Sequence, residues 1–312
     1  MTDFAFVFPG QGSQSVGMLD AWGNHPAVTQ TLLEASDALG EDVAKLIKEG
    51  PKEALALTTN TQPVMLVAGV AAYRAWLAEG GRIPSVVAGH SLGEYSALVA
   101  SGVLTLIQAA PLVRLRAQAM QDAVPVGVGA MAAVLGLDAA KVIAVCAVST
   151  RSSGEIAEAV NFNDPLQTVI AGTKAGVEMA SAALKAAGAK RCLPLPVSAP
   201  FHSSLMKPAA EKLLVALQAL QLSAPQIPVI NNIDVAIETG VDRIRDALYR
   251  QAFGPVRWVE CVQAIQARGV SQIVDCGPGR VLAGMCKRIH ADLTGSALYD
   301  PTTLADVKVA LA

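Results

Sequence analysis

The stretch Gly-His-Ser-Leu-Gly at residues 89–93 places a serine where it could act as a nucleophile. Ser91 has a glycine two positions before it and another two positions after it, which is the G-x-S-x-G pattern of a nucleophile elbow. Small residues at these places let the chain turn sharply from a strand into a helix, so that the hydroxyl stands exposed at the top of a sheet. A plain strand-to-helix turn is the alternative, because five residues alone do not decide between the two.

A serine hydroxyl is a poor nucleophile until a base takes its proton, and a histidine is the usual base. Of the four histidines, we expect His25 to be exposed in a polar loop. We expect His90 to be packed or capping, because neighbours on a tight turn point apart. His202 follows a predicted strand at a helix start, whereas His290 with Asp275 would give the chain order of an α/β-hydrolase triad. His290 is the weaker candidate, since it falls on the polar side of a predicted helix and not on a loop.

An arginine lies on the apolar side of a helix predicted over about residues 105–122. The residues three and four positions from it are Leu112, Val113, Ala119 and Met120. We therefore expect the guanidinium of Arg116 to be buried, where it needs an anionic partner. That partner is either an internal Asp or Glu, in a structural ion pair, or a carboxylate of a ligand held through two parallel hydrogen bonds.

The elements that must position these residues alternate along the chain. Strands are predicted at 4–8, 85–88, 227–233 and 271–277, and helices at about 27–48, 62–79, 92–100, 105–122, 204–221, 240–251, 258–268 and from about 279. This order predicts a parallel sheet covered by helices. The segment 127–197 instead reads as strand-helix-strand-strand-helix-strand, a ferredoxin-like unit. We therefore predict an α/β fold with a large domain formed by 1–126 and 198–312 and a small subdomain, 127–197, inserted into it.

Composition narrows the classes of function. Charged residues make up 16% of the 312 residues and the net charge is −2, whereas a nucleic-acid or anionic-membrane binder would need a basic surplus. The uncharged runs 54–73 and 95–113 contain polar residues and proline, so we expect buried helices and no membrane span. Five cysteines without C-x-x-C spacing predict neither disulfides nor a metal site, and they fit a reducing cytoplasm. The start of the chain carries Asp3 and no basic stretch, so no secretory signal is expected.

Several motifs follow one another in an order that indicates a family. They are FVFPGQGSQSVGM, GHSLGEYSAL, RAQAMQ, NFNDP, VIAG, SAPFHSSLM and DCGPGRVL. Over nearly the whole chain they resemble the malonyl-CoA:acyl-carrier-protein transacylases of dissociated fatty-acid synthesis. The fold that this resemblance implies, a hydrolase-like α/β domain carrying a ferredoxin-like subdomain, agrees with the order of elements above.

The resemblance also implies roles for single residues. Ser91 would be the nucleophile and His202 the base and acid, with the histidine oriented by a main-chain carbonyl, here that of Gln251. The backbone N–H groups of Gln11 and Leu92 would form the oxyanion hole. The second of these also follows from the sequence, because Leu92 stands at the start of the elbow helix, where backbone donors are free.

The same resemblance implies the substrate contacts. Arg116 would clamp the free carboxylate of a malonyl group, and Phe201 would form the pocket wall beside the α-carbon. Asn161 and Asn163 would contact the thioester chain, although an Asx turn before Pro165 explains them equally well.

The expected function is transfer of malonyl from coenzyme A onto Ser91 and then to the phosphopantetheine thiol of an acyl carrier protein. No metal or redox cofactor is implied, and we expect a cytoplasmic monomer that supplies fatty-acid elongation. One alternative is a free-standing acyltransferase of a polyketide synthase or a malonate decarboxylase. The others are a serine thioesterase or esterase, and a carrier-binding module without activity.

Overall fold

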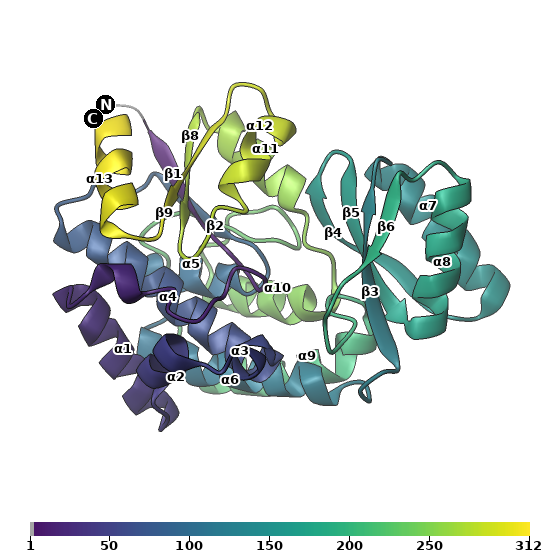
Figure 1. The fold of residues 1–312 in the computed structure, drawn as a ribbon, viewed down its shortest axis with the longest axis horizontal. Helices are drawn as coiled ribbons and strands as arrows, with labels where there is room; N and C mark the ends of the chain where they lie inside the picture. The colour runs from purple at the N-terminus through teal and green to yellow at the C-terminus, as the bar shows by residue number, and fades with distance from the viewer. Residues whose placement is uncertain (1–2) are drawn as a thin grey trace.

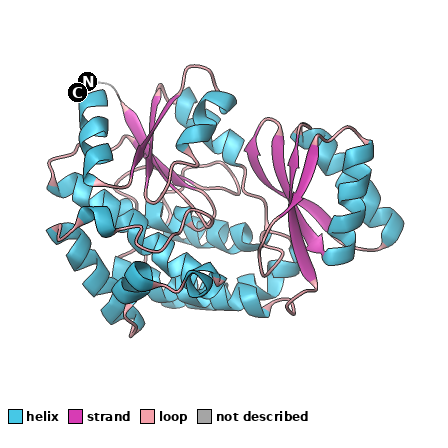
Figure 2. Ribbon diagram, viewed as in Figure 1, coloured by secondary structure: helices cyan, strands magenta, loops and turns pink. Residues whose placement is uncertain are grey.

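The larger part of the protein is built on a five-stranded parallel sheet. In the computed structural model, which describes residues 3–312, its strands are β1 (Phe4–Phe8), β2 (Val86–Gly89), β7 (Val229–Ile230), β8 (Gln272–Cys276) and β9 (Thr294–Leu298). They lie in the order β7-β2-β1-β8-β9, and each neighbouring pair is parallel. Helices lie on both sides of this sheet, as parallel strands with two buried faces require (Figure 2).

Most of the helices belong to this larger part. They are α1 (Pro26–Leu39), α2 (Val43–Glu49), α3 (Lys52–Ala56), α4 (Thr58–Ala78), α5 (Gly93–Ala100), α6 (Leu106–Asp122), α9 (Lys207–Ala219), α10 (Val241–Phe253), α11 (Trp258–Ala267), α12 (Cys286–Ile289) and α13 (Pro301–Ala310). Short 3-10 turns occur at Asp20–Trp22, Ser204–Met206 and Ala283–Met285.

Strand β1 shows how the sequence divides the core between the two faces of the sheet. Successive side chains of a strand point to opposite faces. Phe4, Phe6 and Phe8 therefore share one core with α4, where the rings of Phe6 and Trp76 meet edge to face at 5.5 Å between centroids. The residues between them join a second core that contains Trp258 of α11. This sheet is thereby fixed from both sides, with Ser91 at the end of its strand β2.

The smaller part is an antiparallel sheet with two helices. Its elements are β3 (Gly129–Leu135), α7 (Ala139–Ser153), β4 (Ala157–Asp164), β5 (Gln167–Thr173), α8 (Lys174–Ala186) and β6 (Arg191–Pro194). The strand order β4-β5-β3-β6 is that of the ferredoxin-like unit, so the predicted fold class is confirmed. The exact boundaries at 127 and 197 stay a prediction.

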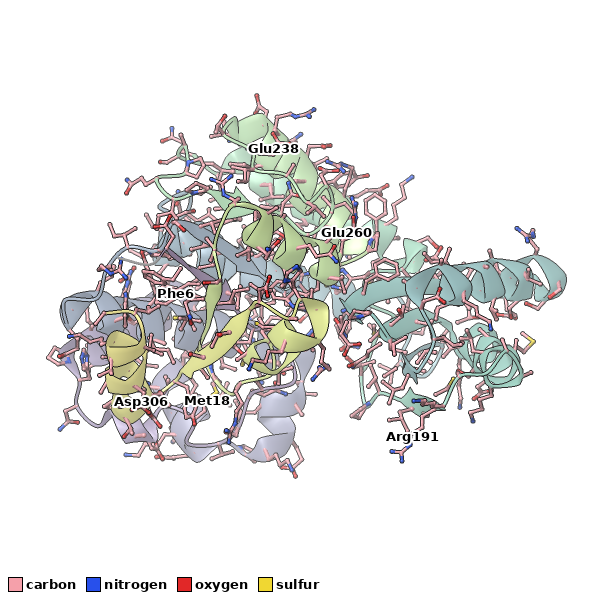
Figure 3. The ribbon with its side chains drawn as sticks, turned by 90° about the horizontal axis from the view of Figure 1, so that it is seen from above. Phe6, Met18, Arg191, Glu238, Glu260 and Asp306 are labelled. Atoms are coloured by element: carbon pink, nitrogen blue, oxygen red, sulfur yellow. The ribbon has the colours of Figure 1, made fainter. Side chains whose placement is uncertain are left out.

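The two faces of the smaller sheet have different partners. Ala132, Val134 and Ile170 form a core with α7 and α8, which cover the outer side in Figure 1. The alternate residues Met131 and Val169 belong instead to the core cluster of the larger part. Figure 3 shows the smaller part, with Arg191, projecting from the body that contains Phe6. The inner face of the smaller sheet, which carries Met131 and Val169, therefore faces the larger part on the side where strand β2 leads to Ser91.

Three element predictions need correction. The helix expected over 27–48 is broken, because Gly40 has a φ of +64° at the end of α1 and Asp42 caps a new helix, α2. The strand expected over 227–233 pairs only at Val229–Ile230, after which the chain leaves the sheet. The single helix expected from about 279 is a 3-10 turn and the four-residue α12, followed by β9 and α13, which the prediction missed.

The uncharged run 54–73 covers the end of α3 and most of α4, and the run 95–113 covers most of α5 and the first half of α6. Within residues 3–312, none of the helices combines the length and the apolar character that a membrane crossing needs. The five cysteines are all buried, as expected for small core residues, and their thiols are unpaired in this structure.

Candidate active site

Ser91 lies on a strained turn between strand β2 and helix α5, with a φ of +53°. The glycines on either side are required by close approach. A Cβ on Gly89 would lie 1.9 Å from the carbonyl carbon of Gly93, and a Cβ on Gly93 would lie 2.0 Å from the main-chain oxygen of Phe8. The backbone N–H of Ser91 donates to Asn232 Oδ1 at 2.7 Å, which holds the turn from the side. The predicted elbow geometry is therefore present, and it turns the hydroxyl toward His202.

His202 is the histidine that reaches this hydroxyl. Its Nε2 lies 2.7 Å from Ser91 Oγ, and its Nδ1 lies 2.9 Å from the main-chain oxygen of Gln251 and 3.2 Å from that of Gly254. Carbonyl oxygens only accept hydrogen bonds, so Nδ1 carries the proton and Nε2 is left to accept from the serine. Burial, and then the charge of Arg116, lowers the pKa of His202 to about 3. The ring is therefore neutral at pH 7, as a general base must be.

Ser91, Asp275 and His290 do not form the triad of the hydrolase-type alternative. The carboxylate of Asp275 accepts from the backbone N–H groups of Leu282 and Ala283, at 2.9 and 3.2 Å. His290 follows the last residue of α12, and its Nδ1 accepts from the backbone N–H of Asp292. Neither side chain contacts Ser91, so the expectation that His290 has no part in the site is consistent with its position.

The remaining two histidines have structural partners. His90 is packed as expected: its Nε2 lies 2.8 Å from Asn163 Oδ1 and its ring lies 5.5 Å from that of Trp258. His25 corrects a prediction, because it is half-buried and not exposed. It caps the start of α1, where its Nδ1 accepts from the backbone N–H of Ala27 at 3.3 Å.

Arg116 is buried, with 2% of its surface exposed. Its Nη1 donates to Gln62 Oε1 at 2.6 Å, and its Nη2 lies 3.1 Å from Gln251 Oε1 and 3.3 Å from Ser91 Oγ. The guanidinium also lies 5.4 Å from the centre of the Tyr95 ring. Over the described part of the chain, no Asp or Glu lies within ion-pair distance of it. Within these residues Arg116 therefore has no structural ion pair, and its buried cation lies beside the Ser91 hydroxyl.

Two backbone donors near the serine are free to bind a ligand. Among residues 3–312, the N–H groups of Gln11 and Leu92 donate to no protein acceptor. The side chain of Gln11 is fixed separately, since its Oε1 accepts from Thr58 Oγ1 at 2.8 Å. An oxyanion hole needs donors of this kind, and its formation by these two amides stays a prediction.

A cavity of about 360 Å³ contains the serine and the histidine. The larger part contributes Gln11, Ser91, Phe201 and His202 to its lining, and the smaller part contributes Met131, Ala133, Asn161, Asn163, Gln167 and Val169. Asn161 Oδ1 is buried there without a partner, whereas Asn163 Oδ1 is engaged by His90. The Asx-type hydrogen bond comes from Asp164 and not from either asparagine, because its Oδ1 accepts from the backbone N–H of Leu166.

Three residues that the sequence analysis did not single out also shape the site. Gln62 binds Arg116, Asn232 binds the turn, and Glu94 binds both Asn232 and Gln251. A signal existed for two of them. Glu94 is the one acidic residue in the long apolar stretch around the elbow, and Asn232 follows a predicted parallel strand at its carboxyl end. Gln62 carried no signal that separates it from other polar residues in a helix.

A serine on a strand-to-helix turn of a parallel sheet, paired with a neutral histidine, is the arrangement of serine-dependent acyl-transfer enzymes of the α/β class. The acyl transferase domain family matches residues 5–292. The malonyl CoA-acyl carrier protein transacylase of Escherichia coli K12 is 54% identical over 306 residues, which cover 98% of each chain. The chain belongs to this family of transacylases.

Solved structures agree with this assignment. The acyl-carrier-protein S-malonyltransferase of Burkholderia pseudomallei is 61% identical, with a TM-score of 0.96 over 98% of this chain and 99% of the other. A malonyl-transacylase solved in complex with a type II polyketide acyl carrier protein is 51% identical, with a TM-score of 0.95 over 97% and 98% of the two chains. The fold around the site is thus the fold of these acyltransferases.

Proposed function

We propose that this enzyme moves malonyl from malonyl-CoA onto Ser91 and from there to the phosphopantetheine thiol of an acyl carrier protein. The observation that carries this proposal is the buried Arg116, which has no carboxylate partner in the described chain and has its Nη2 3.3 Å from Ser91 Oγ. A buried guanidinium in this position favours an acyl group that brings its own carboxylate. The names of the similar enzymes from E. coli and B. pseudomallei support the same substrate and carrier.

In the first half-reaction His202 Nε2 takes the proton of Ser91 Oγ while that oxygen attacks the thioester carbonyl. The carbon–sulfur bond then breaks, and the coenzyme A sulfur leaves with the proton from His202. In the second half-reaction the carrier thiol gives its proton to His202 and attacks the malonyl ester, and Ser91 Oγ leaves and recovers the proton. Because one site serves both steps, ping-pong kinetics are expected. The main-chain oxygen of Gln251 holds the ring throughout, so no triad carboxylate is needed.

Charge that develops on the carbonyl oxygen would be stabilised by the free N–H groups of Gln11 and Leu92. Phe201, which lines the cavity, would limit the space beside the α-carbon of the acyl group. Asn161, with its unpartnered Oδ1, is the better placed of the two asparagines to meet the thioester arm. The clamp at Arg116 would also favour transfer over hydrolysis, because it fixes the acyl group where water is badly placed.

We further infer a cytoplasmic, monomeric enzyme that supplies fatty-acid elongation. The buried, unpaired cysteines fit a reducing compartment. Supply of a polyketide synthase is the second candidate, favoured by the 51% identity to a malonyl-transacylase that was solved with a type II polyketide carrier.

The test is intact-protein mass spectrometry after brief exposure to malonyl-CoA. A malonyl adduct on Ser91 that disappears when a thiol-bearing carrier protein is added, with matching gain of mass on the carrier, is the expected result. Release of free malonate at the same rate without carrier would instead identify a thioesterase. Absence of any adduct would indicate that the protein binds a carrier without catalysing transfer. Comparing fatty-acid and polyketide carriers as acceptors decides between the two pathways.

A further inference from the structure

Glu94 is a buried acid three residues after Ser91, on helix α5, with 2% of its surface exposed. Its Oε2 accepts two hydrogen bonds, from the backbone N–H of Asn232 at 2.9 Å and from Gln251 Nε2 at 3.0 Å. No lysine, arginine or histidine of the described chain forms an ion pair with it. A carboxyl group buried in this way is costly, so its position calls for an explanation beyond packing.

The side-chain amide of Gln251 connects Glu94 to the residues of the site. Gln251 Nε2 donates to Glu94 Oε2 and to the main-chain oxygen of Ser91, both at 3.0 Å. Its Oε1 accepts from Arg116 Nη2 at 3.1 Å. This is the one orientation of the amide in which every group meets a complementary partner. If the amide turned over, its NH₂ would face the guanidinium and its oxygen would face two other oxygens.

We propose that Glu94 is a positioning residue for carboxylate recognition: it fixes the amide of Gln251 so that Oε1 faces Arg116 and keeps the guanidinium aimed at the space beside Ser91. The proposal rests on the proposed function, in which that space receives the malonyl carboxylate. Glu94 acts through Gln251 and does not itself touch the acyl group.

What the position requires is an acceptor at the place of Oε2, and not a negative charge. Burial raises the pKa of Glu94 to about 7, so the group is partly protonated at neutral pH. Both the ionised and the protonated carboxyl can accept from Gln251 Nε2 at one oxygen, whereas only the ionised form could balance the charge of Arg116.

Two substitutions of Glu94 distinguish the need for an acceptor oxygen at this distance from the need for a negative charge. Glu94→Gln keeps an acceptor oxygen at the same distance and removes the charge, whereas Glu94→Asp keeps the carboxylate and withdraws it by one methylene. The readout is the ratio of malonyl to acetyl loading onto Ser91, measured as kcat/KM for each acyl-CoA. We expect Glu94→Gln to keep this ratio within about threefold of wild type and Glu94→Asp to lower it by about tenfold or more, the effect of losing one charge-linked hydrogen bond. Glu94→Met, which removes both acceptor and charge, should match the aspartate variant.

The contrast between the two acyl groups excludes a merely structural role. Glu94 also binds the backbone of Asn232, whose side chain holds Ser91, but loss of that contact would slow malonyl and acetyl loading alike. Asp275→Asn is the matched control, since it alters another buried carboxyl that does not contact Gln251. It should leave the ratio unchanged even if it lowers the melting temperature. Thermal melts of every variant identify those that fold.

The loading ratios of the Glu94 variants show whether the proposal holds. Retention of the ratio by Glu94→Asp with loss in Glu94→Gln would mean that charge is what matters, and it would overturn the proposal. Equal loss for both acyl groups in all variants would overturn it as well. If Glu94→Met does not fold, the aspartate and glutamine pair still decides. If wild type itself does not load malonyl in preference to acetyl, the proposed function fails, a result distinct from failure of the role of Glu94.

Discussion

Replacing Arg116 with alanine is expected to change which acyl group the enzyme selects. The guanidinium is buried and offers Nη2 beside Ser91 Oγ, while its Nε is buried without a partner. A malonyl carboxylate held there would receive charge-assisted hydrogen bonds, each contributing about 1.5–3 kcal/mol. Without the arginine, that carboxylate would lie at a buried position with no counter-ion, at a cost of about 3–5 kcal/mol. Malonyl loading should therefore fall by a factor on the order of a hundred to several thousand.

Acetyl loading should stay level or rise in the same variant, because an acetyl group has no carboxylate to lose its partner. The assay is quenched-flow loading of Ser91 with malonyl-CoA or acetyl-CoA, read by intact mass, in Arg116→Ala and Arg116→Lys. The lysine variant should recover only part of the malonyl rate, since an ammonium cannot make the paired planar contact. Arg114→Ala is the control: it removes an arginine of the same helix that binds Glu41 and Asn60 away from Ser91. Equal loss of malonyl and acetyl loading in Arg116→Ala would refute the reasoning and leave Arg116 a residue of the fold.

Three further predictions concern the nucleophile and its base. Ser91→Ala should form no acyl-enzyme while its melting temperature stays near that of wild type, because only a hydroxyl is removed; wild-type labelling of this variant would place the nucleophile elsewhere. His202→Ala should slow acylation by several orders of magnitude and His290→Ala should do little, as single-turnover rates will show; the reverse result would restore the hydrolase-type triad. Since burial and the charge of Arg116 lower the pKa of His202 to about 3, the base stays neutral as the pH falls, and acylation should hold its rate from pH 8 to about 5. In Arg116→Ala the pH below which acetyl loading slows should be higher than in wild type, because one cause of the low pKa of His202 is gone. A fall in the wild-type rate already near pH 6.5 would contradict the argument that burial lowers the pKa of His202.

The sequence predicts the site best where a local pattern has a single geometric solution. The glycines around Ser91 were predictable from their spacing, because a Cβ at either place would collide with backbone, of Gly93 in one case and of Phe8 in strand β1 in the other. Arg116 could be predicted as buried because its neighbours on the helix are apolar. That its partner is not an internal acid could not be predicted, since the answer depends on the positions of all the acids relative to a helix buried in the core.

The parts that the sequence did not predict depend on contacts far apart in the chain. Asn232 reaches Ser91 across 141 positions, and Glu94 reaches Gln251 across 157.

Two elements were missed for local reasons. Strand β9 was missed because Thr-Gly-Ser-Ala-Leu lacks the apolar, β-branched run of a central strand. It lies at the edge of the sheet, where one neighbour, β8, is enough to pair it. The break between α1 and α2 was present in the sequence as Gly40 and Asp42, but apolar periodicity on both sides concealed it.

Gln251 joins the two tasks of the site in one residue. Its main-chain oxygen accepts from His202 Nδ1 and so sets the tautomer of the base, while its side-chain oxygen accepts from Arg116. Its side-chain nitrogen donates to the main chain of the nucleophile. A shift of this end of α10 would therefore disturb His202, Ser91 and Arg116 together, whereas a change of the side chain alone leaves the oxygen that orients His202. We therefore expect a substitution of the Gln251 side chain to leave His202 oriented while it changes the contacts of Arg116 and of the Ser91 main chain.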